Sequence, residues 1–371
     1  RSTRKPVQFH LKRRGASFVY KGQAVDVKQV ARDLNVRYVL EGSVRSGGQR
    51  MRITGQLIDA ESGGHIWAER YDRNVEDLFA LQDEITEAIV RAIAPEIDQV
   101  ERNRARNIAP SSLDAWGLYH RGLSAFYEST PKSYQEAIDL FDRAFELDGS
   151  FTAAIAMAAA TRTQLVLFEK PEDRDDILKV TEKLAAVAMT LDPTDPVCHF
   201  ADGRVCSFFG KHDISIEKFE RAIALNPNFG LAHYGLGYAY LVSGASELAI
   251  EQYRRLEQLS PNDAISTGSL TNLAVAHFDL KKYEEAIDHG IRATERPNPR
   301  IWALCFLAAS LNKVGRREEA KKALDRLYAL QPKFSLEFVR LAGAHWAPRL
   351  MEHRIELLRD AGVPEVAAEQ A

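Results

Sequence analysis

The side chains best suited to chemistry are three cysteines and ten histidines, and their spacing predicts no catalytic site. Cys198, Cys206 and Cys305 form no C-x-x-C pair, and each falls in an apolar, helical context that is typical of a small core residue. The histidines are scattered along the chain. His233 and His277 fall where a helix faces its neighbours, which favours a structural role over metal binding.

The phosphate-binding and nucleophile motifs of common enzyme families do not occur in the sequence. It contains no P-loop, no H-E-x-x-H and no G-x-S-x-G. Gly235-Leu236-Gly237 lacks the third glycine of a dinucleotide fingerprint, so we interpret it as a helix-packing site. We therefore predict no catalytic residue, no cofactor and no metal ion in this chain.

The composition is that of an ordinary soluble chain of two or three domains. Of the 371 residues, 45% are hydrophobic and 27% are charged, and the net charge of -3 argues against nucleic-acid or membrane partners. Residues 1–14 carry six Lys and Arg and no acid. Such an arm can touch phosphate or lipid, but a solvated flank is the favoured interpretation. Without a membrane-length apolar run or a signal peptide, we expect a cytoplasmic piece of a longer protein.

The larger part of the chain repeats with a fixed period. Pro193, Pro227 and Pro261 are spaced by 34 residues, and six units can be traced between about Asp114 and Pro332. The fourth unit carries the fullest pattern, Leu236, Gly237, Tyr240, Gly244, Ala249, Tyr253 and Pro261. This pattern resembles the tetratricopeptide repeat, which implies a mainly α protein, an α-solenoid of about six helix-turn-helix units. The second unit departs from the pattern, since 165–176 looks like an inserted loop.

The same resemblance implies where a partner binds, because the first helix of each unit lines the concave face in this family. The side chains at those positions are mainly aromatic and apolar, and the Lys and Asn pattern that clamps a peptide carboxylate is absent. We expect a protein or peptide with an apolar or aromatic segment, or the chain's own upstream domain, to bind there. Burial between units is the alternative for each ring. The candidate groove residues are Trp116, Tyr119, Phe126, Tyr127, Phe200, Arg204, Phe208, Tyr234, Tyr238 and Trp302.

A small antiparallel meander is predicted before the repeats. Residues 37–46, 50–59 and 65–71 alternate apolar and polar side chains, and glycine-containing turns separate them. A helix capped by Asp26 precedes the meander. A longer helix follows from about Val75 past Arg91, and Pro95 should kink or end it. Its apolar stripe includes Ile89 and Ile93, and the two helices together are expected to cover one face of the sheet.

A second resemblance covers this region. The runs SFVYKG, VRYVLEGSVR, RITGQLIDA and LQDEIT resemble the TolB amino-terminal-like α/β domain over about 17–97. Members of that family normally begin with a further strand and helix, and residues 1–14 do not resemble that part. The domain is therefore expected to be incomplete here. In many bacterial proteins it joins a class III adenylate or guanylate cyclase domain to tetratricopeptide repeats.

These observations predict four segments and two alternative functions. The segments are a basic flank at 1–14, an incomplete α/β domain with a linker helix at 15–107, repeats at 108–332, and capping helices with a tail at 333–371. The first function is a non-catalytic interaction and regulatory scaffold, the C-terminal region of a multidomain nucleotide cyclase in cAMP signalling, with its catalytic domain upstream of Arg1. The alternative is a free-standing repeat adaptor, or the sensor half of a winged-helix transcription regulator.

Overall fold

The chain divides into two compact units, residues 1–108 and 109–371. The computed structural model describes residues 26–34, 36–47, 50–74, 89, 92–93, 96–97, 100–102, 114–166, 174–259, 266–296 and 300–367. Two predicted segments lie outside the described residues: the basic flank, and most of the helix expected from Val75, including Pro95. Of the described helices, none combines the length and the apolar character needed to cross a membrane.

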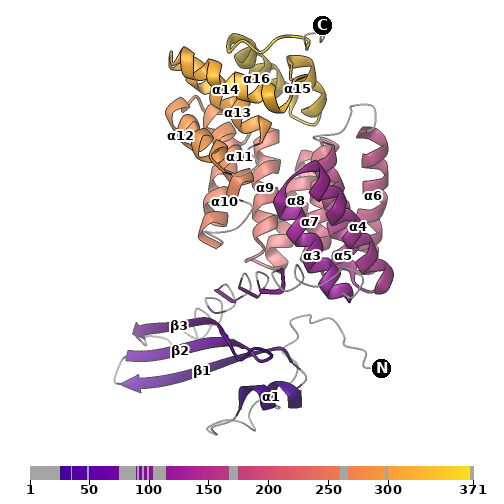
Figure 1. The fold of residues 1–371 in the computed structure, drawn as a ribbon, viewed down its shortest axis with the longest axis vertical. Coiled ribbons are helices and arrows are strands. Elements are labelled where there is room, and N and C mark those ends of the chain that lie inside the picture. The colour runs from indigo at the N-terminus through magenta and orange to yellow at the C-terminus, as the bar shows by residue number, and fades with distance from the viewer. Residues whose placement is uncertain are drawn as a thin grey trace. The chain divides into compact units, whose positions relative to one another are not determined.

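The first unit contains a short helix and a three-stranded antiparallel sheet (Figure 1). Helix α1 (Val27–Leu34) is followed by β1 (Tyr38–Gly47), β2 (Arg50–Asp59) and β3 (His65–Asn74), with the strand order β1-β2-β3. This confirms the predicted meander, although β3 continues to Asn74 rather than ending at Tyr71. Asp26 caps α1 as predicted, because its carboxylate accepts a hydrogen bond of 2.9 Å from the backbone N of Lys28.

Helical residues after β3 cover one face of this sheet. Leu57 of β2 forms a buried cluster with Ile93 and Ile97, and Trp67 of β3 packs at its edge. A Cβ atom at Gly55 would lie 3.0 Å from the Trp67 ring, so the glycine makes room for the indole. The predicted cover by a following helix is confirmed at Ile93, and it gives the small sheet the packing that an isolated meander lacks.

The second unit stacks six helix pairs among its described residues (Figure 1). The pairs are α3 (Ala115–Glu128) with α4 (Pro131–Leu147), α5 (Thr152–Leu165) with α6 (Arg174–Leu191), α7 (Pro196–Phe208) with α8 (His212–Leu225), α9 (Gly230–Ser243) with α10 (Ser246–Leu259), α11 (Ser266–Asp279) with α12 (Tyr283–Thr294), and α13 (Ile301–Lys313) with α14 (Arg317–Leu330). The predicted solenoid of about six units is confirmed. Helix α6 begins at Arg174, inside the stretch predicted to be a loop.

Two further helices follow the six pairs. They are α15 (Leu336–Ala342) and α16 (Pro348–Asp360), and we call them, with the residues between them, the C-terminal hairpin. They lie within residues 333–371, the segment for which capping helices with a tail are predicted. Val363, which follows α16, is buried, and the backbone N of Leu336 donates to the carbonyl of Pro364 over 2.9 Å. The chain after α16 therefore packs back against the start of α15.

Glycines allow the helices of the solenoid to approach closely. A Cβ atom at Gly203 would lie 3.0 Å from the Phe219 ring, and one at Gly237 would lie 2.8 Å from the Tyr253 ring. A Cβ atom at Gly235 would come within 2.3 Å of Phe219, which belongs to the preceding pair. The two glycines of the sequence Gly235-Leu236-Gly237 therefore serve packing, as predicted, because any side chain there would displace an aromatic ring.

Several helix starts can be read directly from the sequence. Thr130 caps α4 by accepting from the backbone N of Ser133 over 3.1 Å, and Pro131 occupies the first turn. Asp195 caps α7 in the same manner, with Pro196 following it. Proline suits this position because the first amides of a helix have no partner within the helix.

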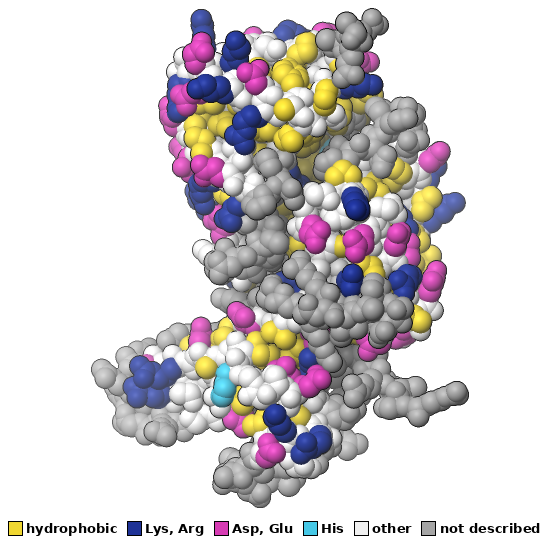
Figure 2. Space-filling view, viewed as in Figure 1, with side chains coloured by type: hydrophobic (Ala, Val, Ile, Leu, Met, Phe, Trp, Pro, Cys, Tyr) yellow, Lys and Arg dark blue, Asp and Glu magenta, His cyan; other side chains and the backbone are white. Residues whose placement is uncertain are grey.

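The distribution of surface charge and the burial of the cysteines are those expected from the sequence. Figure 2 shows Lys and Arg side chains interspersed with Asp and Glu over the visible face of the helical unit.

All three cysteines are free and buried, which confirms the prediction that they are core residues. Burial raises the pKa of the Cys198 thiol to about 12 and that of the Cys206 thiol to about 11. Both thiols are therefore protonated near neutral pH.

Candidate binding site

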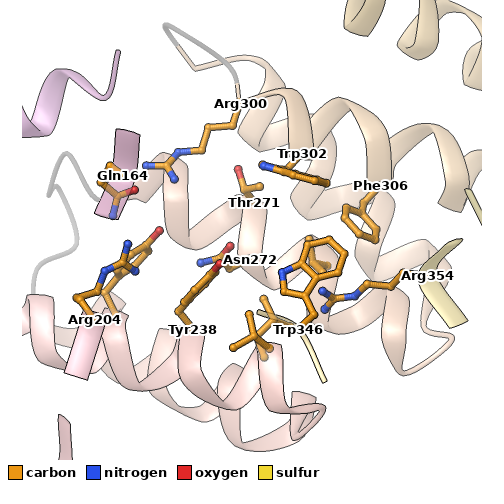
Figure 3. A pocket seen from close by; sticks show the side chains of 14 residues that line it. Gln164, Arg204, Tyr238, Thr271, Asn272, Arg300, Trp302, Phe306, Trp346 and Arg354 are labelled. Atoms are coloured by element: carbon orange, nitrogen blue, oxygen red, sulfur yellow. The ribbon is translucent and has the colours of Figure 1, made fainter. Parts of the chain in front are cut away.

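A pocket lies within the helical unit where the first helices of successive pairs face a common space (Figure 3). Helices α5, α7, α9, α11 and α13 all contribute to it, and the C-terminal hairpin closes one side. The cavity has a volume of about 50 Å³. Its lining residues are Gln164, Arg204, Tyr234, Tyr238, Leu241, Val242, Thr271, Asn272, Val275, Arg300, Trp302, Phe306, Trp346 and Arg354.

The repeat period explains how distant residues reach the same pocket. Arg204, Tyr238, Asn272 and Phe306 recur every 34 residues, so they occupy one equivalent position on four successive first helices. Stacking the pairs places these side chains in a row along the groove. Asn272 and Phe306 were not among the predicted groove residues. Extending the period from Arg204 and Tyr238 through the last two pairs would have identified both.

A second row of equivalent positions contains Phe200, Tyr234, Gly268 and Trp302, again every 34 residues. The glycine in this row has a clear steric role. A Cβ atom at Gly268 would lie 2.9 Å from the Tyr234 hydroxyl oxygen, so the missing side chain leaves space for the phenol. Tyr234 can therefore lie against α11 and present its hydroxyl group to the pocket.

Four of the ten predicted groove residues line the pocket: Arg204, Tyr234, Tyr238 and Trp302. Phe208 lies beside it and stacks on the ring of Tyr238, with 6.1 Å between the ring centroids. Phe200 is buried instead, in contact with Phe219 and Phe229. These six belong to α7, α9 and α13.

The other four predicted residues lie on α3 and do not line this pocket. Trp116 and Tyr119 pack on the ring of Phe151, at centroid distances of 6.0 and 5.0 Å. Phe126 contacts both Tyr127 and Tyr134. Over the whole set of ten, five side chains are buried and five are half-buried. The buried ones are Phe126, Phe200, Arg204, Phe208 and Tyr234.

The segment between α15 and α16 inserts into the groove. His345 stacks on Phe208 at a centroid distance of 4.6 Å, and its Nε2 atom lies 2.6 Å from the Tyr238 hydroxyl oxygen. Trp346 meets Trp302 at 5.5 Å. The backbone N of Ala347 donates to the carbonyl of Val242 over 2.9 Å. The chain's own C-terminal hairpin therefore contacts several of the rings that the sequence predicted for a partner.

A buried ion pair holds this hairpin in place. Arg354 of α16 is 1% exposed and donates through Nε and an Nη atom to the Asp279 carboxylate of α11, over 3.1 and 2.6 Å. The guanidinium group also lies 4.5 Å from the centre of the Trp346 ring. A bidentate pair of this kind fixes the orientation of both side chains. It connects the last helix to the fifth helix pair.

The electrostatics of the groove favour a neutral imidazole at His345. Burial lowers the pKa of His345 well below its usual value, and the nearby basic side chains Arg174, Arg204, His212 and Arg354 act in the same direction. Burial likewise raises the pKa of Tyr238 to about 12, while Arg204 opposes that shift. Near neutral pH, a neutral phenol therefore meets a neutral imidazole.

Several pocket residues carry no periodic signal in the sequence. Gln164 lies at the end of α5, Arg300 precedes α13, and Trp346 belongs to the C-terminal hairpin. No motif links these positions. Within the described part of the chain, no three His, Cys, Asp or Glu side chains gather as ligands for a metal ion. The lining offers guanidinium, amide and hydroxyl groups together with aromatic rings, which are groups suited to binding.

Comparison with known proteins agrees with the repeat architecture. A family described as "Tetratricopeptide repeat" matches residues 208–264, a segment that contains α8, α9 and α10. The curated relative named "Putative adenylate cyclase 3", from Rhizobium meliloti (strain 1021), is 36% identical over 200 residues, or 54% of this chain. This chain spans about a third (34%) of the length of that relative.

Solved structures with similar folds are more distant. PilF of Pseudomonas aeruginosa is 16% identical with a TM-score of 0.42, covering 66% of this chain and 99% of that one. A thermophilic TPR protein of Thermus thermophilus is 14% identical with a TM-score of 0.42, covering 53% and 98%. YrrB, described as a TPR protein with an unusual peptide-binding site, is 19% identical with a TM-score of 0.36, covering 54% and 95%. The family match covers residues 208–264, and the six stacked helix pairs of the helical unit have the fold of a tetratricopeptide-repeat solenoid.

Proposed function

We propose that this chain is the non-catalytic regulatory and scaffolding region of a multidomain nucleotide cyclase that acts in cytoplasmic cAMP signalling. The observation that carries this proposal is the 36% identity over 200 residues to the Rhizobium protein, whose name is that of an adenylate cyclase. Because the chain spans 34% of that relative, most of the relative's length lies elsewhere and is available for a catalytic domain.

The first unit supports the same assignment through the resemblance of about 17–97 to the TolB amino-terminal-like domain. Its sheet is covered by helical residues on the face that carries Leu57, and Glu101, one of the helical residues at 100–102, connects them to the start of the first strand. Glu101 is 4% exposed, pairs with Arg37 over 3.1 Å and accepts a hydrogen bond from Tyr38. In the proposed parent protein this unit connects the catalytic domain to the repeats.

The repeats would serve as the interaction part of this region. Of the ten predicted groove residues, the five half-buried ones are the proposed contacts for an apolar or aromatic segment of a partner or of an upstream domain: Trp116, Tyr119, Tyr127, Tyr238 and Trp302. The groove already holds a segment of that chemistry, since His345 and Trp346 lie against Phe208, Tyr238 and Trp302. A partner that contacts Tyr238 and Trp302 therefore has to displace this segment, and binding is coupled to the position of the C-terminal hairpin.

The reading frame that contains this chain provides the test. We expect it to encode a class III cyclase domain before Arg1, and we expect the full protein to form cyclic nucleotide from ATP or GTP with Mn²⁺. Removing residues 114–367 should change that rate while the catalytic domain stays folded. The purified 371-residue chain should form none. A reading frame without a cyclase domain would overturn the proposal in favour of a repeat adaptor or the sensor half of a winged-helix regulator. An unchanged rate of cyclic-nucleotide formation after the deletion would also overturn it.

A further inference from the structure

The pocket contains more positive charge than the described residues around it neutralise. Three of its lining residues are arginines, Arg204, Arg300 and Arg354. Arg354 is paired with Asp279 over 2.6 Å. No carboxylate among the described residues makes an ion pair with Arg204 or Arg300, and no acidic side chain from those residues lines the cavity.

Arg204 is held in place by neutral groups only. It is 2% exposed, and its Nη2 atom donates to the Thr163 hydroxyl over 3.2 Å. The guanidinium plane lies 5.1 Å from the ring centre of Phe208 and 5.3 Å from that of Tyr238. These contacts orient the cation toward the pocket and leave its charge without an opposite charge.

Arg300 approaches the same end of the cavity from the start of α13, and Tyr234 lines the same cavity. Figure 3 shows Arg204, Arg300 and Gln164 gathered at one end, with Trp302, Phe306 and Trp346 toward the other. Burial lowers the pKa of Arg204, and Arg300 acts in the same direction. A guanidinium group nevertheless remains protonated at neutral pH, so loss of a proton does not relieve this repulsion.

Arg204 is buried beside a second, half-buried cation, Arg300, and a buried charge without a counter-charge is costly. A bound anion removes that cost. Arginine is well suited to this because its planar N–H groups match the oxygens of carboxylate and phosphate. The amide of Asn272 also lies along the cavity; its Nδ2 atom donates to the Tyr253 hydroxyl over 2.9 Å and keeps a second N–H group for a ligand. The cavity of about 50 Å³ holds a few water molecules, or one group of carboxylate or phosphate size.

We propose that the pocket binds a small free oxyanion, a carboxylate or a phosphate, between Arg204 and Arg300. With the C-terminal hairpin in place, the cavity volume favours a small ion over a peptide. Because Trp346 and Arg354 also line the cavity, an anion bound there stabilises the hairpin against the groove. This site does not depend on the proposed cyclase connection.

The test uses the purified chain and three sodium salts at equal ionic strength: phosphate, acetate and chloride. Isothermal calorimetry and the melting temperature should show saturable binding of phosphate or acetate. The salt whose effect saturates at the lower concentration contains the preferred oxyanion. Chloride is the reference for ionic strength. If neither oxyanion exceeds chloride in the wild-type chain, the proposal is overturned without the need for any variant.

Two variants and one control locate the site. Arg204→Gln and Arg300→Gln should each weaken the binding at least tenfold, while circular dichroism confirms that the helices remain. Arg292→Gln is the matched control, because Arg292 is an exposed cation on α12 that pairs with Asp288 over 3.6 Å. Its affinity should equal that of the wild type. If Arg204→Gln fails to fold, Arg300→Gln decides. Unchanged affinity in Arg300→Gln, or equal loss in Arg292→Gln, would contradict the proposed site.

Discussion

Tyr238 and His345 are 107 residues apart in the sequence, yet the Tyr238 hydroxyl oxygen lies 2.6 Å from the His345 Nε2 atom. The first residue belongs to the fourth helix pair and the second to the C-terminal hairpin. Phe208 stacks on His345 at 4.6 Å and joins the third pair to the same contact. The His345 imidazole therefore connects the C-terminal hairpin to the third and fourth helix pairs. Substitutions at His345 and Tyr238 test how much this contact contributes to stability.

Replacing Tyr238 by Phe tests this hydrogen bond. Tyr238→Phe keeps the ring but leaves a buried imidazole nitrogen without a partner, which should lower the free energy of unfolding by about 1–2 kcal/mol. Urea denaturation at pH 7.5 measures the change. Tyr240→Phe serves as the control, because the Tyr240 hydroxyl makes an exposed contact of 3.4 Å with Glu220. Similar losses in both variants would show that the hydrogen bond to His345 adds no stability.

The lowered pKa of His345 predicts that the chain loses stability in mild acid. The unfolded chain takes up a proton at this histidine below about pH 6.5, while the folded chain does not. Stability should therefore fall as the pH falls, by about 1.4 kcal/mol per pH unit for one such histidine. Burial also lowers the pKa of His289 to about 4, so the same direction applies there.

Melting temperatures between pH 7.5 and pH 5 measure this dependence, and His345→Gln separates the contribution of one residue. Glutamine retains hydrogen-bonding capacity but does not titrate in this range. The variant should therefore show a smaller decrease in melting temperature than the wild type, although its stability at pH 7.5 can differ. Parallel pH curves for the two proteins would mean that His345 protonates equally in the folded and unfolded chains.

The Arg354–Asp279 pair predicts a large and non-additive effect. Arg354→Leu leaves a buried carboxylate and should cost about 3–5 kcal/mol of unfolding free energy, and Asp279→Leu should cost a similar amount. The double variant should cost less than the sum, because no unpaired charge remains. Lys179→Leu, which removes an exposed pair with Asp176, should change stability far less. Strict additivity of the two single variants would rule out the coupling.

Helix packing is tested by adding one methyl group. Gly235→Ala places a Cβ atom 2.3 Å from the Phe219 ring, so it should lower the free energy of unfolding by about 1–3 kcal/mol. Gly149→Ala adds the same methyl group where no atom lies within 4 Å, and it should be neutral. Thermal unfolding of both variants gives the comparison. A neutral Gly235→Ala would mean that the two helix pairs can separate at little cost.

The sequence was sufficient for the features that depend on local spacing. The 34-residue period predicted the six helix pairs, and the resemblance to the repeat family predicted that Arg204, Tyr234 and Tyr238 line one groove, where all three line the pocket. The turn glycines and alternating side chains predicted the meander with strand ends in error by no more than three residues. These features are readable because each depends on neighbours in the chain, or on a contact that repeats from one unit to the next.

The tertiary structure alone decided what fills the groove. Nothing in the repeat pattern indicates that His345 and Trp346 lie against Tyr238 and Trp302, or that Arg300 meets Arg204 at the same end of a cavity. Small rotations between successive helix pairs accumulate over the solenoid, and their sum determines which distant residues approach each other. The sequence period specifies how one helix pair follows the next. The contact between the C-terminal hairpin and the groove depends instead on the sum of the rotations over all of the pairs.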